Sequence, residues 1–371
     1  MKFSVSSSEL LKRLQITGGA IGTNPVLPIL EDFLFTIENN RLSIAATDLE
    51  TSISTEVEVM SDSDGSVAVP AKILLETLKA LPQQPITFSI NEDTLGIEIT
   101  SAYGKYKLAG ENGQDFPRIP TPEEVDTVTL PAQTLIQGVN KTLFATSNDE
   151  LRPAMSGVYF QVDFNKVVLV ATDAHKLVKF AFSNVTSEVS TSFIVPKKAL
   201  NLLKSALPSS GDVQLSFNKS NAFISFDDTK LVCRLIDARY PDYNAVIPVD
   251  NPNVLTIPRN DFQNSLKRIA IYANKTTNQV ILKIENGNLT VSAQDLDFSN
   301  EATEQLTCTY DGSPLTIGFN AKFLVEMLGV LDSEEVKIEM STATRAGILL
   351  PTEEKEGEEI LMLVMPVMLS N

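Results

Sequence analysis

The chain has 371 residues, of which 43 % are hydrophobic, and it carries 30 Lys and Arg against 47 Asp and Glu. This apolar content excludes a disordered chain, and the length allows about two or three domains, each with its own core. No apolar run is long enough to span a membrane and the first residues lack a signal-peptide core, so we expect a cytoplasmic protein.

Each third of the chain predicts the same succession of elements. A short opening strand, residues 3–5 in the first third, leads into a helix for which Ser8 is a suitable N-cap. Alternating strands follow, with the turn residues Asn39-Asn40 between two of them, and more strands flank a second helix after Pro70. The strands expected in the first third are 33–37, 42–46, 86–90 and 95–100. This order predicts an α+β fold with antiparallel sheets.

Three sequence markers recur with a period of about 125 residues, which indicates three tandem copies of one domain. The markers are a strand end before a helix (Pro70, Pro196, Asn320), an aspartate after a strand (Asp48, Asp173, Asp295) and the start of the first helix (Ser6, Pro131, Pro258). We therefore expect domains at residues 1–122, 123–250 and 251–371. Their linkers are expected in the Pro- and Asp-rich stretches 117–126 and 241–252.

The six predicted helices are basic although the chain as a whole is acidic. They hold 13 Lys and Arg against 4 Asp and Glu, whereas the remaining residues hold 17 against 43. Such segregation can steer a polyanion toward the helices. The alternative is that Lys and Arg simply occupy solvated helix faces. The helices counted here are residues 6–20, 71–82, 131–146, 196–208, 258–275 and 320–331.

Few residues suggest catalysis or metal binding. Cys233 and Cys308 lack partner spacing, so neither a disulfide framework nor a zinc site is expected. The single histidine, His175, excludes a site built on several histidines, and no nucleophile lies in a suitable context beside it. The recurring aspartates fit Asx turns better than three active sites. We expect no catalytic residue, no metal and no cofactor.

The triplicated units, the motifs TDLE (47–50), TDAHKL (172–177) and PDY (241–243), and the terminal VMPVML (364–369) together resemble one family over the whole chain. That family is the bacterial DNA polymerase III beta subunit, the DNA sliding clamp. The resemblance implies a non-catalytic processivity factor: a head-to-tail homodimer that closes a six-domain ring around duplex DNA without sequence preference. The residues expected to face DNA are Lys12, Arg13, Lys72, Lys79, Lys141, Arg152, Lys197, Lys198, Lys204, Arg259, Lys267, Arg268 and Lys322.

The resemblance also implies two surfaces that bind protein. One closes the dimer, with a basic and apolar edge strand against an apolar and acidic partner patch. The dimer residues are Lys105, Tyr106, Lys107 and Leu108 on one side and Ile271, Tyr272, Asp297, Glu301 and Glu304 on the other.

The second surface is a hydrophobic pocket for short linear motifs of the DNA polymerase III alpha subunit, the clamp loader, other polymerases and repair proteins. Met and Pro side chains in such a pocket suit several partners. The pocket residues are Met155, Thr172, Ala174, His175, Lys176, Leu177, Pro241, Val246, Asn320, Phe323, Thr344, Ala346, Leu363, Val364, Met365, Pro366, Val367 and Met368.

The sequence departs from the family pattern at some of these positions. Family members commonly carry Gly at Ala174 and Arg at Lys176, Ala245 and Met368, so we expect the peptide preference to differ. Two residues, 370 and 371, extend beyond the usual terminal Leu. A different class of function stays open here: a three-repeat module that binds a protein or a glycan and has no DNA role.

Overall fold

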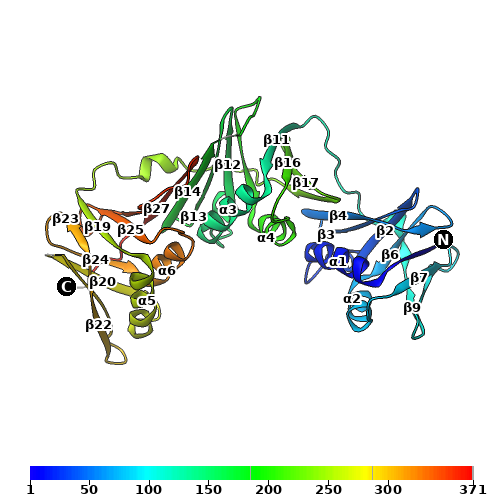
Figure 1. Cartoon of the computed structure of the whole chain (residues 1–371), viewed down its shortest axis with the longest axis horizontal. Helices are drawn as coiled ribbons and strands as arrows, with labels where there is room; N and C mark the ends of the chain where they lie inside the picture. The colour runs from blue at the N-terminus through cyan, green and yellow to red at the C-terminus, as the bar shows by residue number, and fades with distance from the viewer. Residues whose placement is uncertain (184, 286, 370–371) are drawn as a thin grey trace. The chain divides into compact units, whose positions relative to one another are not determined.

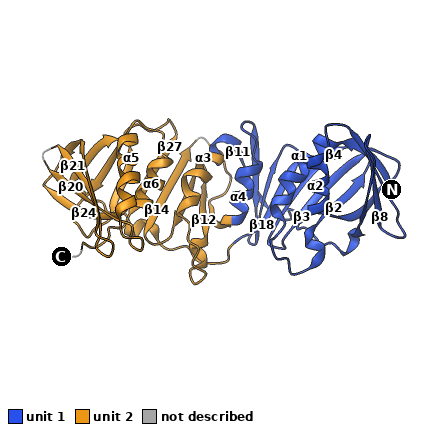
Figure 2. Cartoon of the chain, turned by 90° about the horizontal axis from the view of Figure 1, so that it is seen from below, with its two compact units in different colours: residues 1–135, 198–235 blue, residues 136–197, 236–371 orange. Residues whose placement is uncertain are grey.

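The computed structural model describes residues 1–183, 185–285 and 287–369, and it divides into two compact units. Unit 1 comprises residues 1–135 and 198–235, and unit 2 comprises residues 136–197 and 236–371 (Figure 2). The middle third of the chain is thus shared between the units. In the described part of the chain, no helix is long and apolar enough to cross a membrane.

Unit 1 contains the whole first repeat and the four strands of the second repeat that join it (Figure 1). Its helices α1 (Ser7–Thr17) and α2 (Ala71–Ala80) pack against each other. Its strands are β1 (Lys2–Ser6), β2 (Asp32–Glu38), β3 (Arg41–Thr47), β4 (Thr51–Glu58), β5 (Met60–Ser61), β6 (Gly65–Pro70), β7 (Pro85–Ile90), β8 (Gly96–Thr100), β9 (Lys105–Ala109), β10 (Glu111–Asn112), β11 (Asp126–Pro131), β16 (Asp212–Phe217), β17 (Asn221–Phe226) and β18 (Thr229–Arg234).

These strands form two antiparallel sheets. The five-stranded sheet has the order β5-β1-β7-β8-β9, and the nine-stranded sheet has the order β10-β6-β2-β3-β4-β18-β17-β16-β11. In the second sheet, β4 of the first repeat pairs with β18 of the second repeat, so hydrogen bonds join two repeats at this point.

Unit 2 is built on the same plan. Its helices α5 (Arg259–Ile269) and α6 (Ala321–Gly329) pack against each other, while α3 (Ala132–Thr142) and α4 (Lys197–Ala206) each run from one unit into the other. Its strands are β12 (Gly157–Asp163), β13 (Lys166–Thr172), β14 (Lys176–Ser183), β15 (Thr191–Pro196), β19 (Asn253–Pro258), β20 (Gln279–Glu285), β21 (Asn288–Asp295), β22 (Asn300–Thr307), β23 (Thr309–Asp311), β24 (Leu315–Asn320), β25 (Glu335–Met340), β26 (Gly347–Pro351) and β27 (Glu358–Val364).

The sheets of unit 2 are again one of nine strands and one smaller. Their orders are β15-β12-β13-β14-β27-β26-β25-β19-β23 and β22-β21-β20-β24. Here β14 of the second repeat pairs with β27 of the third repeat. The compact units therefore follow the shared sheets rather than the sequence repeats, and the domain boundaries after residues 122 and 250 stay a prediction.

The helices form because apolar residues recur every three to four positions and face a sheet. In α1 the buried leucines are Leu10 and Leu14, and in α5 the buried residues include Phe262, Leu266 and Ile269. Burying each of these side chains contributes about 1.5–3 kcal/mol relative to leaving it exposed. This packing fixes which helix face is left for solvent.

The expected elements are confirmed in type and approximate position, with one local correction. Asn39 and Asn40 have φ angles of 53° and 61°, as a tight hairpin turn requires. Ser8 is not the N-cap, because α1 already begins at Ser7. Ser6 occupies the cap position without a side-chain hydrogen bond to the helix. The η1 turn (Gly18–Ala20) follows the end of this helix.

The recurring aspartates form Asx turns, as expected. Oδ1 of Asp48 accepts hydrogen bonds from the amides of Glu50 and Thr51 at 3.0 and 2.7 Å. Asp173 does the same in the second repeat, and Asp295 accepts from the amide of Asp297 at 3.1 Å. Each aspartate thus caps the turn that leads into the next strand.

Candidate functional site

The junction of the second and third repeats, within unit 2, brings together most of the expected pocket residues. Because β14 pairs with β27, Lys176 lies opposite Val364 and Leu177 lies opposite Leu363. Strand β26 pairs with the other edge of β27 and adds Ile348. We call the buried residues at this point the junction cluster: Val170, Leu177, Ile194, Tyr240, Tyr243, Ala346, Ile348 and Leu363.

Two buried tyrosines of this cluster lie at or just before the start of the segment that the sequence predicts as a linker: Tyr240 precedes the 241–252 stretch and Tyr243 lies within it. The rings of Tyr240 and Tyr159 stack with centroids 4.5 Å apart, and Tyr243 contacts Tyr159 edge-on at 6.5 Å. Burial raises the pKa of the Tyr240 hydroxyl, which stays protonated. The start of the 241–252 stretch is therefore packed. The PDY motif was its only sequence signal, and it did not reveal burial.

The turn before β14 forms one wall of the site. Ala174 has a φ of 75°, a left-handed conformation that glycine adopts without strain. The hydroxyl of Thr172 donates to the carbonyl of Lys176 at 2.8 Å, which closes the turn. The His175 ring lies over the Phe323 ring of α6, with centroids 6.4 Å apart. His175 is thus a wall residue exposed to solvent.

Lys176 is buried within this wall, where it makes ion pairs and a ring contact. Its ammonium lies 3.0 Å from Glu326 Oε2 and 3.2 Å from Asp173 Oδ2, and it sits 4.2 Å from the centre of the Phe323 ring. Only 7 % of its side chain is exposed. Lys176 therefore connects the second repeat to α6 of the third repeat and is not available to contact a ligand directly. Glu326 was missed by the sequence reasoning.

The C-terminal residues form the opposite wall. Strand β27 ends at Val364, and the Met365 amide then donates to the His175 carbonyl at 2.8 Å. The Val367 amide donates to the Gly318 carbonyl at 2.8 Å. The backbone at 367 is therefore anchored to β24, while the Met368 side chain after it stays exposed. Residues 370 and 371 lie outside the described residues.

Three of the remaining expected pocket residues have exposed apolar side chains. The exposed fraction is 57 % for Val246, 41 % for Met365 and 69 % for Met368. Met155, Pro241, Val246 and Thr344 each lie one or two positions in the sequence from a residue that packs in or against the junction cluster. Those packed residues are Ala154, Tyr240, Ile247 and Ala346, respectively. Asn320 has a structural role, since its side chain accepts from the Lys322 amide and caps α6.

The expected DNA-facing residues divide into two groups. Six lysines are exposed, and for their ammonium groups the described residues provide no ion pair. They are Lys12, Lys72, Lys79, Lys204, Lys267 and Lys322. Lysines 72, 198 and 322 occupy the same position in three repeats, two residues after the strand end that precedes the helix. This recurrence points to a role shared by the repeats.

The other basic residues have partners within their own unit. Arg13 contacts Glu9 at 2.9 Å, Arg152 contacts Asp149 at 2.8 Å, and Lys198 pairs with Asp48. Arg259 donates to the carbonyls of Ser333 and Leu328, and Lys197 donates to Asn148. The guanidinium of Arg268 binds both carboxylate oxygens of Glu304 at 2.7 and 2.6 Å, which lowers the pKa of Glu304.

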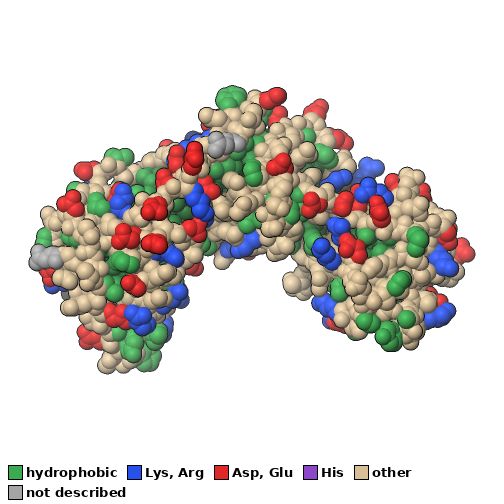
Figure 3. All heavy atoms as spheres, in the orientation of Figure 1, with side chains coloured by type: hydrophobic (Ala, Val, Ile, Leu, Met, Phe, Trp, Pro, Cys, Tyr) green, Lys and Arg blue, Asp and Glu red, His purple; other side chains and the backbone are tan. Residues whose placement is uncertain are grey.

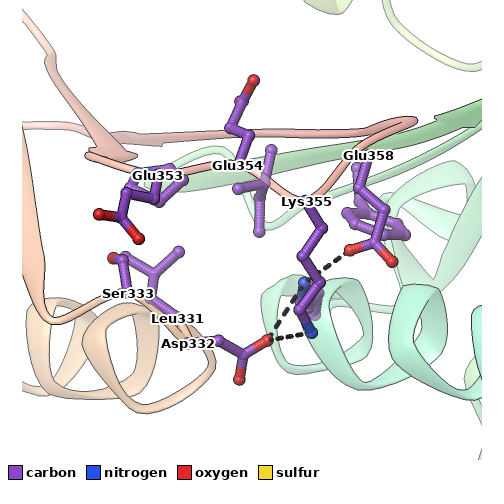
Figure 4. A pocket seen from close by; sticks show the side chains of 11 residues that line it. Leu331, Asp332, Ser333, Glu353, Glu354, Lys355 and Glu358 are labelled. Atoms are coloured by element: carbon purple, nitrogen blue, oxygen red, sulfur yellow. Dashed lines mark hydrogen bonds and ion pairs between the residues drawn. The ribbon is translucent and has the colours of Figure 1, made fainter.

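Lys141 is corrected outright, because only 10 % of its side chain is exposed. Its ammonium lies 3.4 Å from Glu358 and 3.7 Å from Asp332, and it sits 4.8 Å from the centre of the Phe180 ring. Figure 4 shows this pocket, where Asp332 also binds Lys355 at 3.2 Å. Lys141 links the second repeat to the third, and its buried ammonium lacks the exposure that a contact with phosphate requires. The pocket is small, about 30 Å³.

The two expected dimer patches lie on the free edges of the smaller sheets. Strand β9, with Lys105 to Leu108, is the edge of the five-stranded sheet, and β22, with Glu301 and Glu304, is the edge of the four-stranded sheet. Beside β22, exposed apolar side chains gather: Ile271, Tyr272, Leu296 and Phe298. Leu296 and Phe298 were not expected from the sequence. Figure 3 shows acidic and basic side chains exposed on the viewed face of each unit.

Comparison with known proteins covers the whole chain. Family models of the DNA polymerase III beta subunit match residues 1–120 (N-terminal domain), 129–242 (central domain) and 244–367 (C-terminal domain). The chain is 30 % identical to the beta sliding clamp of Proteus mirabilis and 28 % identical to that of Vibrio cholerae, with all of each chain covered. The crystal structure of a sliding clamp from Bartonella birtlesii bound to griselimycin matches with a TM-score of 0.93 at 29 % identity, also over both whole chains. The resemblance expected from the motifs is confirmed.

Proposed function

This chain belongs to the DNA polymerase III beta subunit family and is a DNA sliding clamp, a non-catalytic processivity factor with three clamp domains. From that premise we propose how its residues close the ring, face the DNA and bind partners. The alternative of a module without a DNA role is set aside. We also propose that the domains divide near residues 122 and 250 and that the clamp works in the cytoplasm.

The pairing of strands between repeats supports our proposal for how the ring closes. The strand after the Asx turn of one repeat pairs with the last strand of the next repeat, as β4 does with β18 and β14 does with β27. The third repeat has the corresponding strand β22, and the first repeat has the corresponding strand β9, both at free edges. Pairing β22 with β9 of a second copy would join sheets of four and five strands into a third sheet of nine. Two such contacts close a dimer.

The side chains at the two edges suit this contact. Strand β9 presents exposed Lys105 and Lys107, which alternate along the strand with half-buried Tyr106 and Leu108. The β22 side presents exposed Glu301 and Asp297 next to exposed apolar residues. Glu304 is already bound by Arg268, so we assign it to shaping β22 rather than to pairing with a lysine of the second copy. Opposite charge and apolar contact together favour one register of pairing.

For DNA we propose that the six exposed lysines provide the phosphate contacts. They are spread over α1, α2, α4, α5 and α6. Each single contact with phosphate is weak and independent of sequence, which permits sliding once the ring surrounds the duplex. Basic residues that are paired inside the units add less, because a phosphate would have to displace their carboxylate, carbonyl or amide partners.

For partners we propose the surface of the junction cluster, with its rim of Val246, Met365 and Met368. An apolar surface with flexible methionines suits a short peptide segment with apolar side chains. The partners are the polymerase, the clamp loader and repair proteins. We also propose that this surface binds griselimycin, the ligand of the Bartonella structure.

A topological experiment tests the clamp proposal. The protein is loaded by the clamp loader of its own organism onto nicked circular DNA, and its retention is compared before and after the circle is cut to a linear form. We expect retention on the circle and loss after cutting, because a ring slides off a free end. Changing Lys12, Lys72 and Lys322 to Glu together should reduce retention on the circle, whereas Lys283→Glu in β20 is the matched control. Equal retention on linear and circular DNA would contradict encirclement.

A further inference from the structure

The C-terminal tail, residues 365–369, is held by β24 after β27 has ended. The Val367 amide donates to the Gly318 carbonyl at 2.8 Å. The side-chain amide of Gln279 in β20 donates to the Met368 carbonyl at 3.4 Å. These two tethers lie on either side of the peptide bond between residues 367 and 368, and they fix the backbone that carries the exposed Met368 side chain.

Gly318 leaves no room for a side chain beneath this tail. A Cβ atom at Gly318 would lie 2.7 Å from the carbonyl oxygen of Val367 and 2.9 Å from both Gln279 Nε2 and Leu369 Cδ2. The nearest of these atoms belongs to the backbone, so a rotamer change cannot relieve the contact. The tail itself would have to move.

In the other two repeats the chain also crosses the strand that precedes the second helix, but at a residue other than glycine. In the second repeat the Ile236 amide donates to the carbonyl of Ile194 at 3.0 Å, and in the first repeat Glu111 of β10 pairs with Ala68 of β6. Ala68, Ile194 and Gly318 occupy the same repeat position, two residues before the marker that precedes the second helix. In the first two repeats the chain continues into the next repeat and is anchored on both sides. In the described part of the third repeat, the tail depends on this crossing.

We propose that Gly318 is a positioning residue for ligand binding. It contacts no ligand, but by lacking a side chain it lets the tail lie close to β24. Met365 and Met368 then stand at the rim of the junction cluster. The ligand class is a peptide segment with apolar side chains. This inference rests on the proposed pocket function.

The test compares full-length Gly318→Ala with the unchanged chain and with Gly329→Ala as the matched control. Gly329 ends α6, and a Cβ there would meet only the flexible end of Gln263, at 3.1 Å. Griselimycin is the probe, its affinity is measured by calorimetry, and amide hydrogen exchange of residues 365–369 reports the tail. We expect Gly318→Ala to lose affinity about tenfold and to lose protection in the tail, because a loosened binding wall costs affinity. Gly329→Ala should keep both.

Gln279→Ala is the second variant, because it removes one tether without adding volume. We expect it to lose affinity about threefold, in line with one weak neutral hydrogen bond. Unchanged affinity or unchanged tail protection in Gly318→Ala would overturn the role of Gly318. Failure of the unchanged chain to bind griselimycin would instead refute the proposed pocket, and the hydrogen-exchange comparison would still report on the tail.

Discussion

The two internal junctions share the same backbone hydrogen bond but have different kinds of side chain around it. At the second junction, in unit 2, the Met365 amide donates to the carbonyl of His175, and at the first junction, in unit 1, the Arg234 amide donates to the carbonyl of Glu50 at 2.9 Å. At equivalent positions of the repeat, the first junction thus has Arg234 where the second has Met365, and Glu50 where the second has His175. Two charged residues that form an ion pair at the first junction thus stand where the second junction has a methionine and a histidine.

The first junction is closed by charge. Glu50 and Arg234 form an ion pair at 3.5 Å with both side chains mostly exposed, and Lys198 pairs with Asp48. Where α6 presents Phe323 to the second junction, α4 has Ala199. The comparison teaches that the repeat supplies the same backbone arrangement twice within one chain, whereas the side chains that surround it differ between the two junctions.

The largest effect is expected from removing the aromatic ring that distinguishes the second junction. Phe323→Ala should weaken griselimycin binding about 30-fold, or ~2 kcal/mol, because a central aromatic side chain carries much of the energy of a small interface. Calorimetry measures the change. Phe262→Leu, a buried change in α5, is the control for a loss of stability alone. Binding that falls equally in both variants would show that Phe323 has no specific role.

The next effect concerns the lysine of each junction. Lys176→Met removes a buried cation from beside two carboxylates, of which Asp173 is 17 % and Glu326 is 45 % exposed, so we expect the free energy of unfolding to fall by about 2 kcal/mol. Lys198→Met removes a pair whose lysine is 45 % exposed, and we expect a loss of about 0.5 kcal/mol. Urea unfolding measures both, and Lys176→Met combined with Glu326→Gln should recover part of the loss. Equal losses at the two positions would contradict the contrast between a buried and a solvated junction.

A buried charge in unit 1 sharpens the comparison further, because it is unpaired. Asp32 at the start of β2 is 6 % exposed and its Oδ2 has no hydrogen-bond partner. Burial, then the nearby Glu111 and Glu31, raise the pKa of its carboxyl to about 6. The folded state therefore binds this proton more tightly than the unfolded chain does, and stability is lost as pH rises from about 4 to about 6.

Asp32→Asn removes this penalty. We expect a gain of about 1–2 kcal/mol at pH 7.5 and almost none at pH 4, measured by urea unfolding at both values. The exposed Asp62 is the control: backbone hydrogen bonding lowers the pKa of its carboxyl, so Asp62→Asn should give no gain. A gain at Asp32 that does not depend on pH would refute the electrostatic explanation.

Local and repeated features could be predicted from the sequence, whereas long-range partners could not. The Asx turns at Asp48 and Asp173 depend on residues two or three positions away, and the helices depend on apolar spacing within one segment. Lys141 was misassigned because one of its partners, Glu358, is 217 residues away in the sequence. Burial of Tyr243 depends in the same way on Tyr159, which is also far away in the sequence. The repeat was a long-range signal in the sequence, whereas the pocket at the second junction was expected from the family resemblance.

The pairing of edges β9 and β22 also has a consequence for assembly. The two edges are different, so a pair of copies joined by one contact still has a free β9 edge on one copy and a free β22 edge on the other. Further copies could add at these edges, as in the growth of a filament. Exposed strand edges are also templates for unwanted aggregation. Closure after two copies ends both the growth and the exposure, so a change that alters the angle between copies would convert a finite ring into an open polymer.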